Sequence, residues 1–509
     1  MDPILSSGND GDALSPHLLG FIHLDRDGEQ PLYLQLIFGL RQAITDRRLE
    51  GGVRLPSSRD LASALDVSRN TVKNSYEQLV AEGYLEARVG AGTFVSPQLP
   101  AFVAHHPPPS RPVPPSGPRT ISRLGQALAP FGASALSMPG RRQVGSIFTP
   151  GLPALEAFPW KAWKRLTARS FRHLPADSFG YFSPVSGYLP LRQAIATYLK
   201  ATRGLRCQPE QIVITPGSQM ASYIAAHVVL NPGDAVWVEN PGYGGVRGSL
   251  RYREARLVPV PVDEEGLDVA AGIKSEPDAR LAVVTPSHQY PLGHTMSLTR
   301  RLQLLEWAAQ NGAWILEDDY DSEYRYDGPP LGALQGLDSH ERVIYAGTFS
   351  KVMFPALRLG YLVLPPDLVH AAVGMLLPMG QLTSILNQSV LADFINEGHF
   401  ARHIRRMRRL YQQRRDVLLQ EIEARLGDRV VIGPADCGMH LALQFPASIS
   451  QMKVQGQLAN EDRWAVPLAG GFHEPGSMEG IILSFSNAPP EQIREDVALL
   501  ADAIRYAQD

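Results

Sequence analysis

The 509-residue sequence is poor in cysteine and contains no long apolar run. Its two cysteines, Cys207 and Cys437, lie far apart without a CxxC spacing, which excludes a disulfide framework and a zinc ribbon. No apolar run reaches the roughly 18 residues of a membrane span, so we expect no transmembrane helix. The first residues also lack the basic and apolar segments of a secretory signal. These absences together favour a protein of the reducing cytoplasm.

The sequence also lacks an excess of charge of either sign. Its formal net charge of -3 gives no bulk attraction to nucleic acid or to an anionic membrane, so any DNA binding must come from a local patch. An apolar share of 44% with 19% charged residues is typical of a globular protein, and the length predicts more than one domain. We expect residues 1–28 to form a flexible tail.

Residues 29–96 have the pattern of three short helices followed by a hairpin. The first helix is indicated by apolar residues at helical spacing from Leu32 to Ile44. Serine N-caps are expected for a short second helix after Pro56 and, at Ser68, for a third. The glycine-rich stretch 83–95 is typical of a β-hairpin. The order of elements predicts a small helical domain with a wing.

The third helix has two different faces. Val72, Tyr76, Leu79 and Val80 form an apolar stripe that we expect to be buried. The opposite face carries cations and an amide near its N-terminus, where a recognition helix meets base edges and phosphates. The alternative is a small packing module with a solvated charged face. The polar residues of the first turn are Arg69, Asn70 and Lys73.

Three sequence words in this region resemble the winged helix-turn-helix of GntR-type regulators. They are Leu-Pro-Ser-Ser-Arg, Val-Ser-Arg-Asn-Thr-Val and Gly-x-Gly-Thr-Phe-Val, in the order and spacing of that family. The resemblance implies binding to a double-stranded DNA operator. It implies DNA contacts from Arg59, Ser68, Arg69, Asn70, Lys73 and the wing-tip Gly90, with Arg54 as a weaker phosphate candidate.

A proline-rich stretch follows the hairpin. Residues 97–118 include nine prolines, which favour extended conformations and cannot build a core. We therefore expect a semi-rigid linker over residues 97–140. His105 and His106 lie within it, but no further ligand residues stand nearby, so no metal site is predicted.

One later loop has the residues of a covalent cofactor site. The apolar run 343–345 ends in Gly-Thr-x-Ser, which is typical of a buried strand that runs into a loop. Lys351 offers an amine, Thr348 and Ser350 offer hydroxyls, and Arg358 offers a fixed cation. These groups suit an aldehyde that carries a phosphate, because the amine forms a Schiff base while the others bind phosphate oxygens. The alternative is an ordinary surface loop.

From residue 141 onward the sequence alternates apolar strands with helical stretches, which predicts an α/β fold. One strand runs into a glycine turn and a helix N-terminus, a site for anions. Another strand delivers a tyrosine at its end, and a third ends in acidic residues. The residues at these three ends are Gly217, Ser218 and Gln219; Tyr243; and Asp318, Asp319 and Tyr320.

Five words in order resemble the fold-type-I aminotransferases that use pyridoxal 5'-phosphate (PLP): Gly-Ser-Gln, Pro-x-Tyr, Asp-Asp-Tyr, Thr-x-Ser-Lys and Arg-x-Gly. The resemblance implies a large α/β/α domain over residues 141–380 and a small α+β domain over residues 381–509. It implies that Lys351 holds PLP, that Asp318 faces the pyridine nitrogen, that Tyr243 stacks on the ring and that Tyr320 binds the 3-oxygen. The implied phosphate set is Gly217, Ser218, Gln219, Thr348, Ser350 and Arg358. Asp319 and Asp321 are expected to serve the turn.

Two positions depart from the aminotransferase pattern. Tyr290 stands where many of these enzymes have an asparagine that bonds the cofactor's 3-oxygen, and the neighbouring His288 could either reach the ring or cap the turn. Ile482 stands where many have an arginine that grips the substrate carboxylate. No carboxylate clamp is therefore visible, which argues against efficient turnover.

A basic helix near residue 400 has two possible roles. Its arginines on one face could meet another subunit or DNA, or they could form a solvated surface. These arginines are Arg402, Arg405, Arg406 and Arg409.

The order of head, linker and aminotransferase-like domain resembles the MocR subfamily of GntR regulators over nearly the whole chain. The resemblance implies a PLP-dependent transcription factor, usually a head-to-tail homodimer, that senses PLP or an amine. The missing arginine favours PLP itself, as in a PdxR-like sensor, or an amine whose acid group is held differently. The alternatives are an active aminotransferase with a DNA-binding head and a regulator that has lost PLP.

Overall fold

The computed structural model divides into two compact units, residues 1–126 and 127–509. The division falls within the stretch 97–140 that the sequence predicts to be a linker. Most of that linker, including His105 and His106, lies outside the described residues. The structure describes residues 22–26, 28, 30–97, 120–126, 128–129, 132, 145–180, 184–328, 331–380, 383–473 and 478–508.

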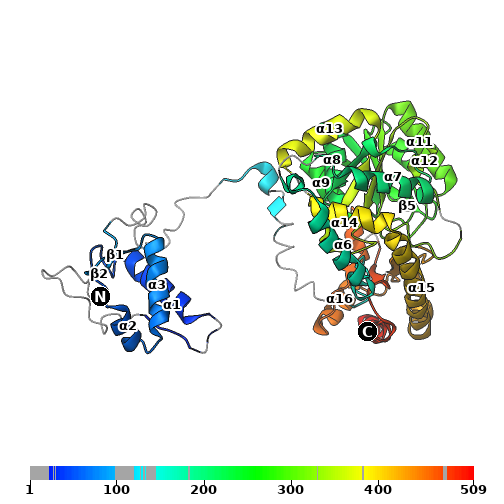
Figure 1. Ribbon diagram of the computed structural model, residues 1–509. Coiled ribbons are helices and arrows are strands. Elements are labelled where there is room, and N and C mark those ends of the chain that lie inside the picture. The colour runs from blue at the N-terminus through cyan, green and yellow to red at the C-terminus, as the bar shows by residue number, and fades with distance from the viewer. Residues whose placement is uncertain are drawn as a thin grey trace. The chain divides into compact units, whose positions relative to one another are not determined.

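Residues 32–95 of the first unit form three helices and a two-stranded hairpin (Figure 1). Helices α2 and α3 begin at serine N-caps: Ser57 accepts a hydrogen bond from the Asp60 amide and Ser68 one from the Thr71 amide. The hairpin strands pair in antiparallel register from Leu85 opposite Val95 to Arg88 opposite Gly92. The elements are α1 (Leu32–Thr45), α2 (Ser58–Ala64), α3 (Arg69–Ala81), β1 (Leu85–Arg88) and β2 (Gly92–Val95).

The core of this unit differs from the expectation at two points. Ile22 is 6% exposed and packs in the core, so part of the predicted tail belongs to the folded head. Val80 is only partly buried, whereas Ser75 is fully buried and donates to the Tyr33 carbonyl oxygen at 3.0 Å. A small hydroxyl that finds a backbone acceptor can be buried at little cost, so the apolar pattern alone did not identify it.

The second unit contains an eight-stranded mixed sheet with the order β3-β10-β9-β8-β7-β4-β5-β6. Strands β5, β4, β7, β8 and β9 run parallel to one another, while β10 is antiparallel to both β3 and β9, and β6 is antiparallel to β5. The strands are β3 (Ile212–Thr215), β4 (Ala235–Asn240), β5 (Arg256–Asp263), β6 (Gly266–Leu267), β7 (Leu281–Val284), β8 (Trp314–Asp319), β9 (Val343–Thr348) and β10 (Gly360–Val363).

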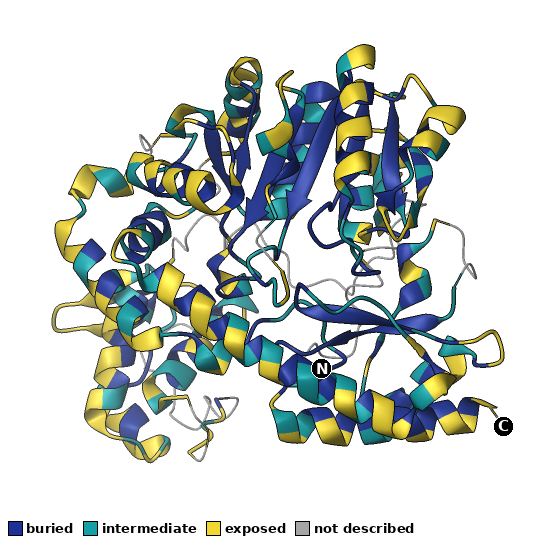
Figure 2. Ribbon diagram, turned by 90° about the vertical axis from the view of Figure 1, so that its right-hand side faces the viewer, coloured by how far each residue is buried: buried dark blue, intermediate teal, exposed yellow. Residues whose placement is uncertain are grey.

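Helices cover both faces of this sheet, as Figure 2 shows for its dark blue strands. Val236 and Val238 of β4 pack in one apolar cluster with α8 and α13, whereas the intervening Trp237 packs in another with α11. Successive strand residues point to opposite faces, so strands covered on both sides are apolar throughout. The covering helices are α7 (Leu189–Arg203), α8 (Ser218–Val229), α9 (Gly244–Tyr252), α10 (Val269–Ser275), α11 (Leu298–Asn311), α12 (Leu334–Leu337) and α13 (Pro366–Leu376).

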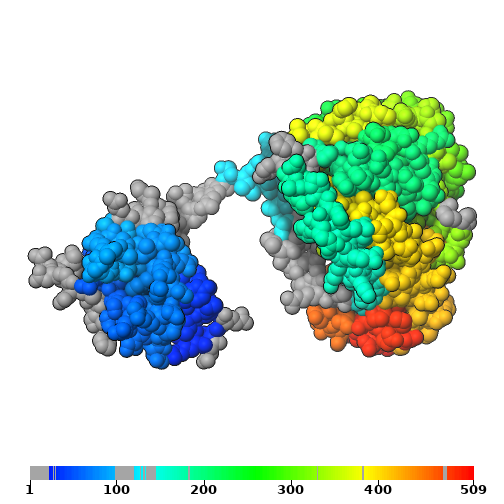
Figure 3. Space-filling model, viewed as in Figure 1, coloured from blue at the N-terminus to red at the C-terminus, as the bar shows by residue number. Residues whose placement is uncertain are grey.

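The small domain is built on a four-stranded antiparallel sheet with the order β11-β12-β14-β13. The long helix α15 packs against α17, and α17 packs against α16. Helix α14 contacts both α6 and α7, and their residues form one continuous surface in the space-filling view (Figure 3). The elements are α6 (Trp160–His173), α14 (Ile385–Asn396), α15 (His399–Arg425), β11 (Val431–Ile432), β12 (His440–Gln444), α16 (Gln451–Asn460), β13 (Val466–Pro467), β14 (Gly480–Ser484) and α17 (Pro490–Gln508).

The segment at residues 146–154 packs on the small domain, although its position in the sequence suggests the large one. The Ile147 carbonyl oxygen accepts a hydrogen bond from the Ser484 amide at 2.7 Å. The buried carboxylate of Asp496 accepts bonds from the Ser146 hydroxyl and the Ile147 amide. A chain that returns to an earlier segment in this way leaves no local sequence signal, because its partners lie more than 300 residues away.

Among the described residues, no helix has both the length and the apolar character needed to cross a membrane. Cys207 and Cys437 are both buried and unpaired thiols.

Candidate functional site

Lys351 lies just beyond the end of β9, in a tight turn at the edge of the large sheet. Its Nζ donates a hydrogen bond to the Gly151 carbonyl oxygen at 3.0 Å. Gly151 has a φ of +77°, and a Cβ at this position would collide with Nζ, so glycine leaves room for the amine. Burial lowers the pKa of the Lys351 amine, and the carboxylates of Asp321 and Asp318 oppose that effect. A buried amine with a lowered pKa is a good nucleophile.

Asp318 lies on β8, beside Ala346 of β9 in parallel register. Its side chain is buried, and its Oδ1 has no hydrogen-bond partner among the described residues. Burial, with Asp319 and Glu239 nearby, raises the pKa of Asp318 to about 7, while Lys351 acts in the opposite direction. A buried carboxyl with an unpaired oxygen requires a partner. The protonated nitrogen of a pyridine ring would satisfy it.

Tyr320, His288 and Asp321 form a connected set of hydrogen bonds. The Tyr320 hydroxyl donates to the His288 carbonyl oxygen at 2.9 Å and lies 3.1 Å from His288 Nδ1. His288 Nδ1 also lies 3.1 Å from each carboxylate oxygen of Asp321. His288 therefore does more than cap a turn, because it links the tyrosine to a buried acid.

The expectation that Asp319 and Asp321 serve the turn is wrong. Asp319 is buried and forms an ion pair with Arg203 at 2.8 Å, and the Tyr345 hydroxyl donates to it at 2.5 Å. Asp321 holds His288, as described above. Acidic residues at the end of a buried strand enter the protein interior with the strand, and each then needs a buried partner.

The predicted phosphate residues lie at one edge of the sheet. Thr215 of β3 pairs with Gly360 of β10, which in turn pairs with Thr348 of β9. Gly217 and Ser218 follow Thr215 in the sequence. Arg358 precedes Gly360, and Ser350 follows Thr348. This row brings together two segments that lie about 130 to 145 positions apart in the sequence.

The backbone at this edge is suited to an anion. Gly217 is the N-cap of α8 with a φ of +120°, so the free amides of the first helical turn face outward. The Thr348 hydroxyl accepts a bond from the Ser350 amide at 3.2 Å. Arg358 has a left-handed backbone with a φ of 52°, and its exposed side chain makes no ion pair with any described residue. The helix end, hydroxyls and guanidinium together suit a phosphate.

Tyr243 is the N-cap residue of α9 and is 38% exposed. Its hydroxyl accepts a hydrogen bond from Gln219 Nε2 at 3.1 Å. Its ring meets that of Tyr290 edge to face, with centroids 5.5 Å apart. The structure thus brings the candidate stacking residue, a candidate phosphate residue and the residue at the asparagine position into one group.

His440, the first residue of β12, also belongs to this site, although no sequence pattern pointed to it. Its buried ring lies 4.7 Å from that of His288 and 5.2 Å from that of Tyr290. Burial lowers the pKa of His440 well below its ordinary value, and the neighbouring His288 and Lys351 add to that effect. Its Nε2 has no hydrogen-bond partner among the described residues. A glycine turn before a strand was the only local signal, and it does not reveal a partner about 150 positions away.

Three of these residues could also meet around a metal ion. Donor atoms of His288, Asp321 and His440 all lie within 4.8 Å of one another. Structural zinc sites have four protein ligands, so this group of described residues is one short. His288 and Asp321 already hydrogen-bond to each other, so two of the three possible ligands have a partner within the protein.

Ile482 occupies the position at which an arginine clamp was sought. It lies on β14 opposite Ala442 of β12 and is fully buried. It packs in an apolar cluster with Leu292, Ala442 and Leu468, and the Tyr290 ring packs against this cluster. The position is therefore filled by a packed apolar side chain.

The predicted DNA contacts of the head lie on its surface. Arg59, Ser68, Arg69, Asn70, Lys73 and Gly90 are exposed, and Arg54 is partly exposed. Arg69 Nε donates to the Ser58 hydroxyl at 3.4 Å, which connects the starts of α2 and α3. Ser68 is occupied as the N-cap of α3, and Lys73 pairs with Glu77 at 3.6 Å. The Arg54 backbone bridges to Phe94, so this residue lies beside the wing.

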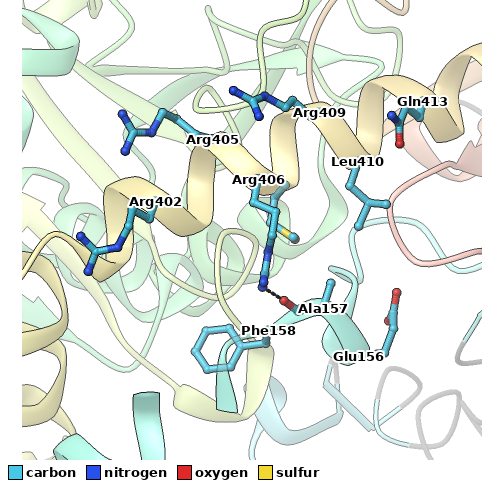
Figure 4. A pocket seen from close by; sticks show the side chains of 10 residues that line it. Glu156, Ala157, Phe158, Arg402, Arg405, Arg406, Arg409, Leu410 and Gln413 are labelled. Carbon is cyan, nitrogen blue, oxygen red and sulfur yellow. Dashed lines mark hydrogen bonds between the residues drawn. The ribbon is translucent and has the colours of Figure 1, made fainter. Parts of the chain in front are cut away.

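The basic face of α15 borders a hollow of about 710 Å³ (Figure 4). Arg406 points across it and donates to the Ala157 carbonyl oxygen. Arg405 and Arg409 make no ion pair with a described residue, and Arg402 donates to the Glu397 carbonyl oxygen and lies 3.0 Å from His399 Nδ1. The structure therefore places the four arginines on one surface.

Comparison with known proteins matches both units. Residues 32–95 match the bacterial regulatory proteins of the gntR family, and residues 154–495 match the aminotransferases of class I and II. The chain superposes on LysN, an α-aminoadipate aminotransferase from Thermus thermophilus solved with N-(5'-phosphopyridoxyl)-L-leucine, with a TM-score of 0.67 and 29% identity over 74% of this chain and 97% of that one. The expected fold class is confirmed: a GntR-type winged helix-turn-helix joined to a fold-type-I aminotransferase fold.

Full-length relatives share this combination. The chain is 40% identical to the probable rhizopine catabolism regulatory protein MocR of Rhizobium meliloti, over 94% of this chain and 95% of the relative. It is 32% identical to the pyridoxine biosynthesis transcriptional regulator PdxR of Corynebacterium glutamicum, over 92% and 95%. The chain belongs to the MocR subfamily of GntR-type transcriptional regulators.

Proposed function

We propose that this regulator binds its operator through the winged head and senses PLP, or an amino compound, through Lys351. The observation that supports the proposal is that one chain contains both the site around Lys351 and a GntR-type head. The residues fit the cofactor on structural grounds: Asp318 offers an unpaired buried oxygen, Lys351 an amine of lowered pKa, and the edge around Gly217 a set of anion-binding groups.

Each residue of the site would have a separate task. Lys351 would hold the cofactor covalently, and Asp318 would keep its ring nitrogen protonated. Tyr243 would stack on the ring and Tyr320 would bond the 3-oxygen. Bound PLP supplies an aldehyde for amines and a ring that withdraws electrons. The phosphate would be held by Gly217, Ser218, Gln219, Thr348, Ser350 and Arg358.

The DNA-binding role is proposed for specific residues of the head. Arg69, Asn70 and Lys73 lie on the first turn of the recognition helix, where side chains reach base edges and phosphates. Arg59 and Ser68 would add further DNA contacts, and Arg54 would meet a phosphate of the DNA backbone. Gly90 would lie at the wing tip near the minor groove. We further propose a cytoplasmic, head-to-tail homodimer, in which a change at Lys351 alters the spacing or orientation of two heads.

A gel-shift titration of the full chain with promoter DNA tests the proposal. The measurement is made without PLP, with PLP, and with PLP plus each member of a panel of primary amines. We expect PLP or an amine to change the operator affinity, and we expect Lys351→Ala to remove that response while keeping basal DNA binding. Lys164→Ala, which removes an exposed lysine on α6, is the matched control. A response that survives in Lys351→Ala contradicts the proposal.

Sustained transamination is the second candidate function, favoured by the match of residues 154–495 to aminotransferases. Tyr290 and Ile482 argue against it, since they replace the residues that many such enzymes use at the cofactor and the substrate carboxylate. A coupled assay distinguishes the two. Conversion of many equivalents of an amino donor per chain would establish an enzyme, whereas at most one equivalent is expected of a sensor.

A further inference from the structure

The segment at residues 146–154 is bound to the small domain at its start by a buried acid of α17. The Asp496 carboxylate accepts hydrogen bonds from the Ser146 hydroxyl at 2.8 Å and from the Ile147 amide at 3.0 Å. Asp496 is fully buried, and Arg463 Nε donates to its other carboxylate oxygen at 3.0 Å. A buried carboxylate with this many donors is held firmly, so it fixes the start of the segment to the small domain.

Two further hydrogen bonds hold the end of the segment. The Ser486 hydroxyl, just after β14, donates to the Leu152 carbonyl oxygen at 2.6 Å. The Ala154 amide donates to the Tyr411 hydroxyl of α15 at 3.0 Å. The small domain therefore contacts the segment on both sides of Gly151, which lies between these anchors.

Gly151 connects this segment to the large domain. Its carbonyl oxygen accepts the 3.0 Å hydrogen bond from Lys351 Nζ, and Lys351 follows β9 of the large sheet. A Cβ on Gly151 would collide with Nζ, so the amine lies directly against the segment. This hydrogen bond joins the proposed cofactor lysine to a piece of chain that is held by the small domain.

The same segment is also close to the DNA-binding head in the sequence. Only residues 141–145 separate it from residues 97–140, the predicted linker, and the winged head precedes that linker. Because peptide geometry is fixed, a displacement of Ser146 is passed to the preceding residues through the covalent chain. The segment is therefore placed to report on Lys351 to the linker.

The Lys351 nitrogen can donate to Gly151 freely only while it is an amine. When a neutral amine condenses with an aldehyde, both of its N–H hydrogens leave with the aldehyde oxygen as water, and a carbon–nitrogen double bond forms. The Schiff-base nitrogen keeps at most one hydrogen, gained by protonation, whose direction is fixed by the double bond. A second amine that takes over the aldehyde carbon passes two hydrogens back to the lysine nitrogen, which becomes a donor again.

We infer that the Gly151 carbonyl oxygen holds the Lys351 amine whenever the lysine is free, and that the segment 146–154 passes this state to the linker. Gly151 is thus a positioning residue. The hydrogen bond is lost when Lys351 holds the cofactor and forms again when an amine captures it, so the head responds to amine capture. This inference rests on the proposed function, because it assumes covalent attachment of PLP to Lys351.

Two forms of the cofactor separate the state of Lys351 from occupancy of the site. PLP carries an aldehyde, whereas pyridoxamine 5'-phosphate has the same ring and phosphate with an amine in place of the aldehyde, so it leaves the lysine free. Hydrogen–deuterium exchange of the full chain is measured with each compound at saturation, on peptides that cover residues 146–154. We expect exchange to be about threefold or more faster with PLP, because one hydrogen bond to the segment is lost.

Lys351→Ala is the control for this measurement. Without the lysine, neither compound can change the bond to Gly151, so the peptides should exchange at the same rate with both. A difference that persists in Lys351→Ala overturns the inference, because it would come from the two compounds themselves and not from the state of the lysine.

Operator affinity tests the connection to the head. In the natural chain, the PLP and pyridoxamine 5'-phosphate forms should differ in operator affinity by about threefold or more. The double variant Ser146→Ala, Ser486→Ala removes two anchors of the segment without leaving a large cavity, so it should lose this difference while still attaching PLP. Ser170→Ala, which removes a buried hydroxyl between α6 and α14, is the matched control and should keep the difference.

The outcomes separate this inference from the proposed function. Equal exchange or equal operator affinity of the two forms of the natural chain overturns the inference, and so does a double variant that keeps the natural difference. Failure of the proposed function would appear as the absence of any cofactor on Lys351 after borohydride reduction of the chain loaded with PLP. Attached cofactor together with equal exchange would therefore refute the inference alone.

Discussion

The head and the site around Lys351 place their functional side chains in opposite environments. In the head, Arg59, Asn70 and Lys73 are exposed on short helices that begin at serine caps. In the site, Asp318 and His440 are buried, and their pKa values are shifted by burial. A polyanion such as DNA can be met by exposed donors on a rigid helix. A reactive small molecule requires a site from which water is removed, which tunes the protonation of its groups.

The two environments predict effects of different size, from covalent cofactor attachment in the site to operator affinity in the head. The largest expected effect is at Lys351. Lys351→Ala should abolish covalent attachment of PLP, because no other described lysine lies beside Asp318 and the phosphate edge. Borohydride reduction followed by peptide mass mapping measures this attachment. The circular dichroism spectrum of the variant should stay unchanged, which shows that the fold is intact. Reduced cofactor retained by the folded variant would contradict the assignment.

The second prediction concerns the buried carboxyl of the site. The pKa of Asp318 is raised from 3.8 to about 7, so the folded chain holds a proton that the unfolded chain has released. Without cofactor, stability should therefore fall as the pH rises between these two values. Asp318→Asn stays neutral and removes this loss. Between about pH 5 and pH 8, its stability relative to the natural chain should rise by about 1–3 kcal/mol.

Urea unfolding of the cofactor-free natural chain and of Asp318→Asn at both pH values measures this difference. Glu239, Glu317 and Glu323 also have pKa values raised to about 7 by burial, so the absolute stability of both proteins should fall with pH. Only the difference between the two proteins reports on Asp318. A difference that is independent of pH would mean that Asp318 is ionised throughout this range.

The third prediction concerns the recognition helix. Arg69→Ala should weaken operator binding by about 1–3 kcal/mol and relax the preference for the operator over unrelated DNA. Fluorescence anisotropy with both DNAs at fixed salt measures the two effects. Arg429→Ala, which removes an exposed arginine from the other unit, should leave operator affinity unchanged. Unchanged affinity in Arg69→Ala would place the DNA-reading surface elsewhere on the head.

The smallest effect is expected at Lys73. Its ion pair with Glu77 is exposed and adds little stability, so the ammonium is available to a phosphate. Lys73→Ala should weaken binding to operator and to unrelated DNA by the same factor. The slope of log affinity against log salt should become shallower by about 1. Loss of discrimination between the two DNAs would instead assign Lys73 to base recognition.

Local sequence patterns predicted the head well, because its elements depend on near neighbours. The serine caps, the buried positions Val72, Tyr76 and Leu79, and the hairpin with its glycine tip agree with the structure. The predicted tail was too long, because Ile22, which precedes the first helix, packs in the core of the head. Contacts of this kind are set by packing, which local periodicity does not record.

The sequence by itself determined which residue types could hold a phosphate-bearing aldehyde and in which order they occur. It also determined the fold class, since apolar strands that alternate with helices favour a sheet covered on both faces. The roles of the individual residues remain predictions. Only the tertiary structure decided that Asp319 faces Arg203, that Asp321 holds His288, and that His440 joins them from the small domain. A buried charge pairs with whichever opposite charge or polar group lies close to it in space. These partners come from segments that are far apart in the sequence, so only the folded structure shows them.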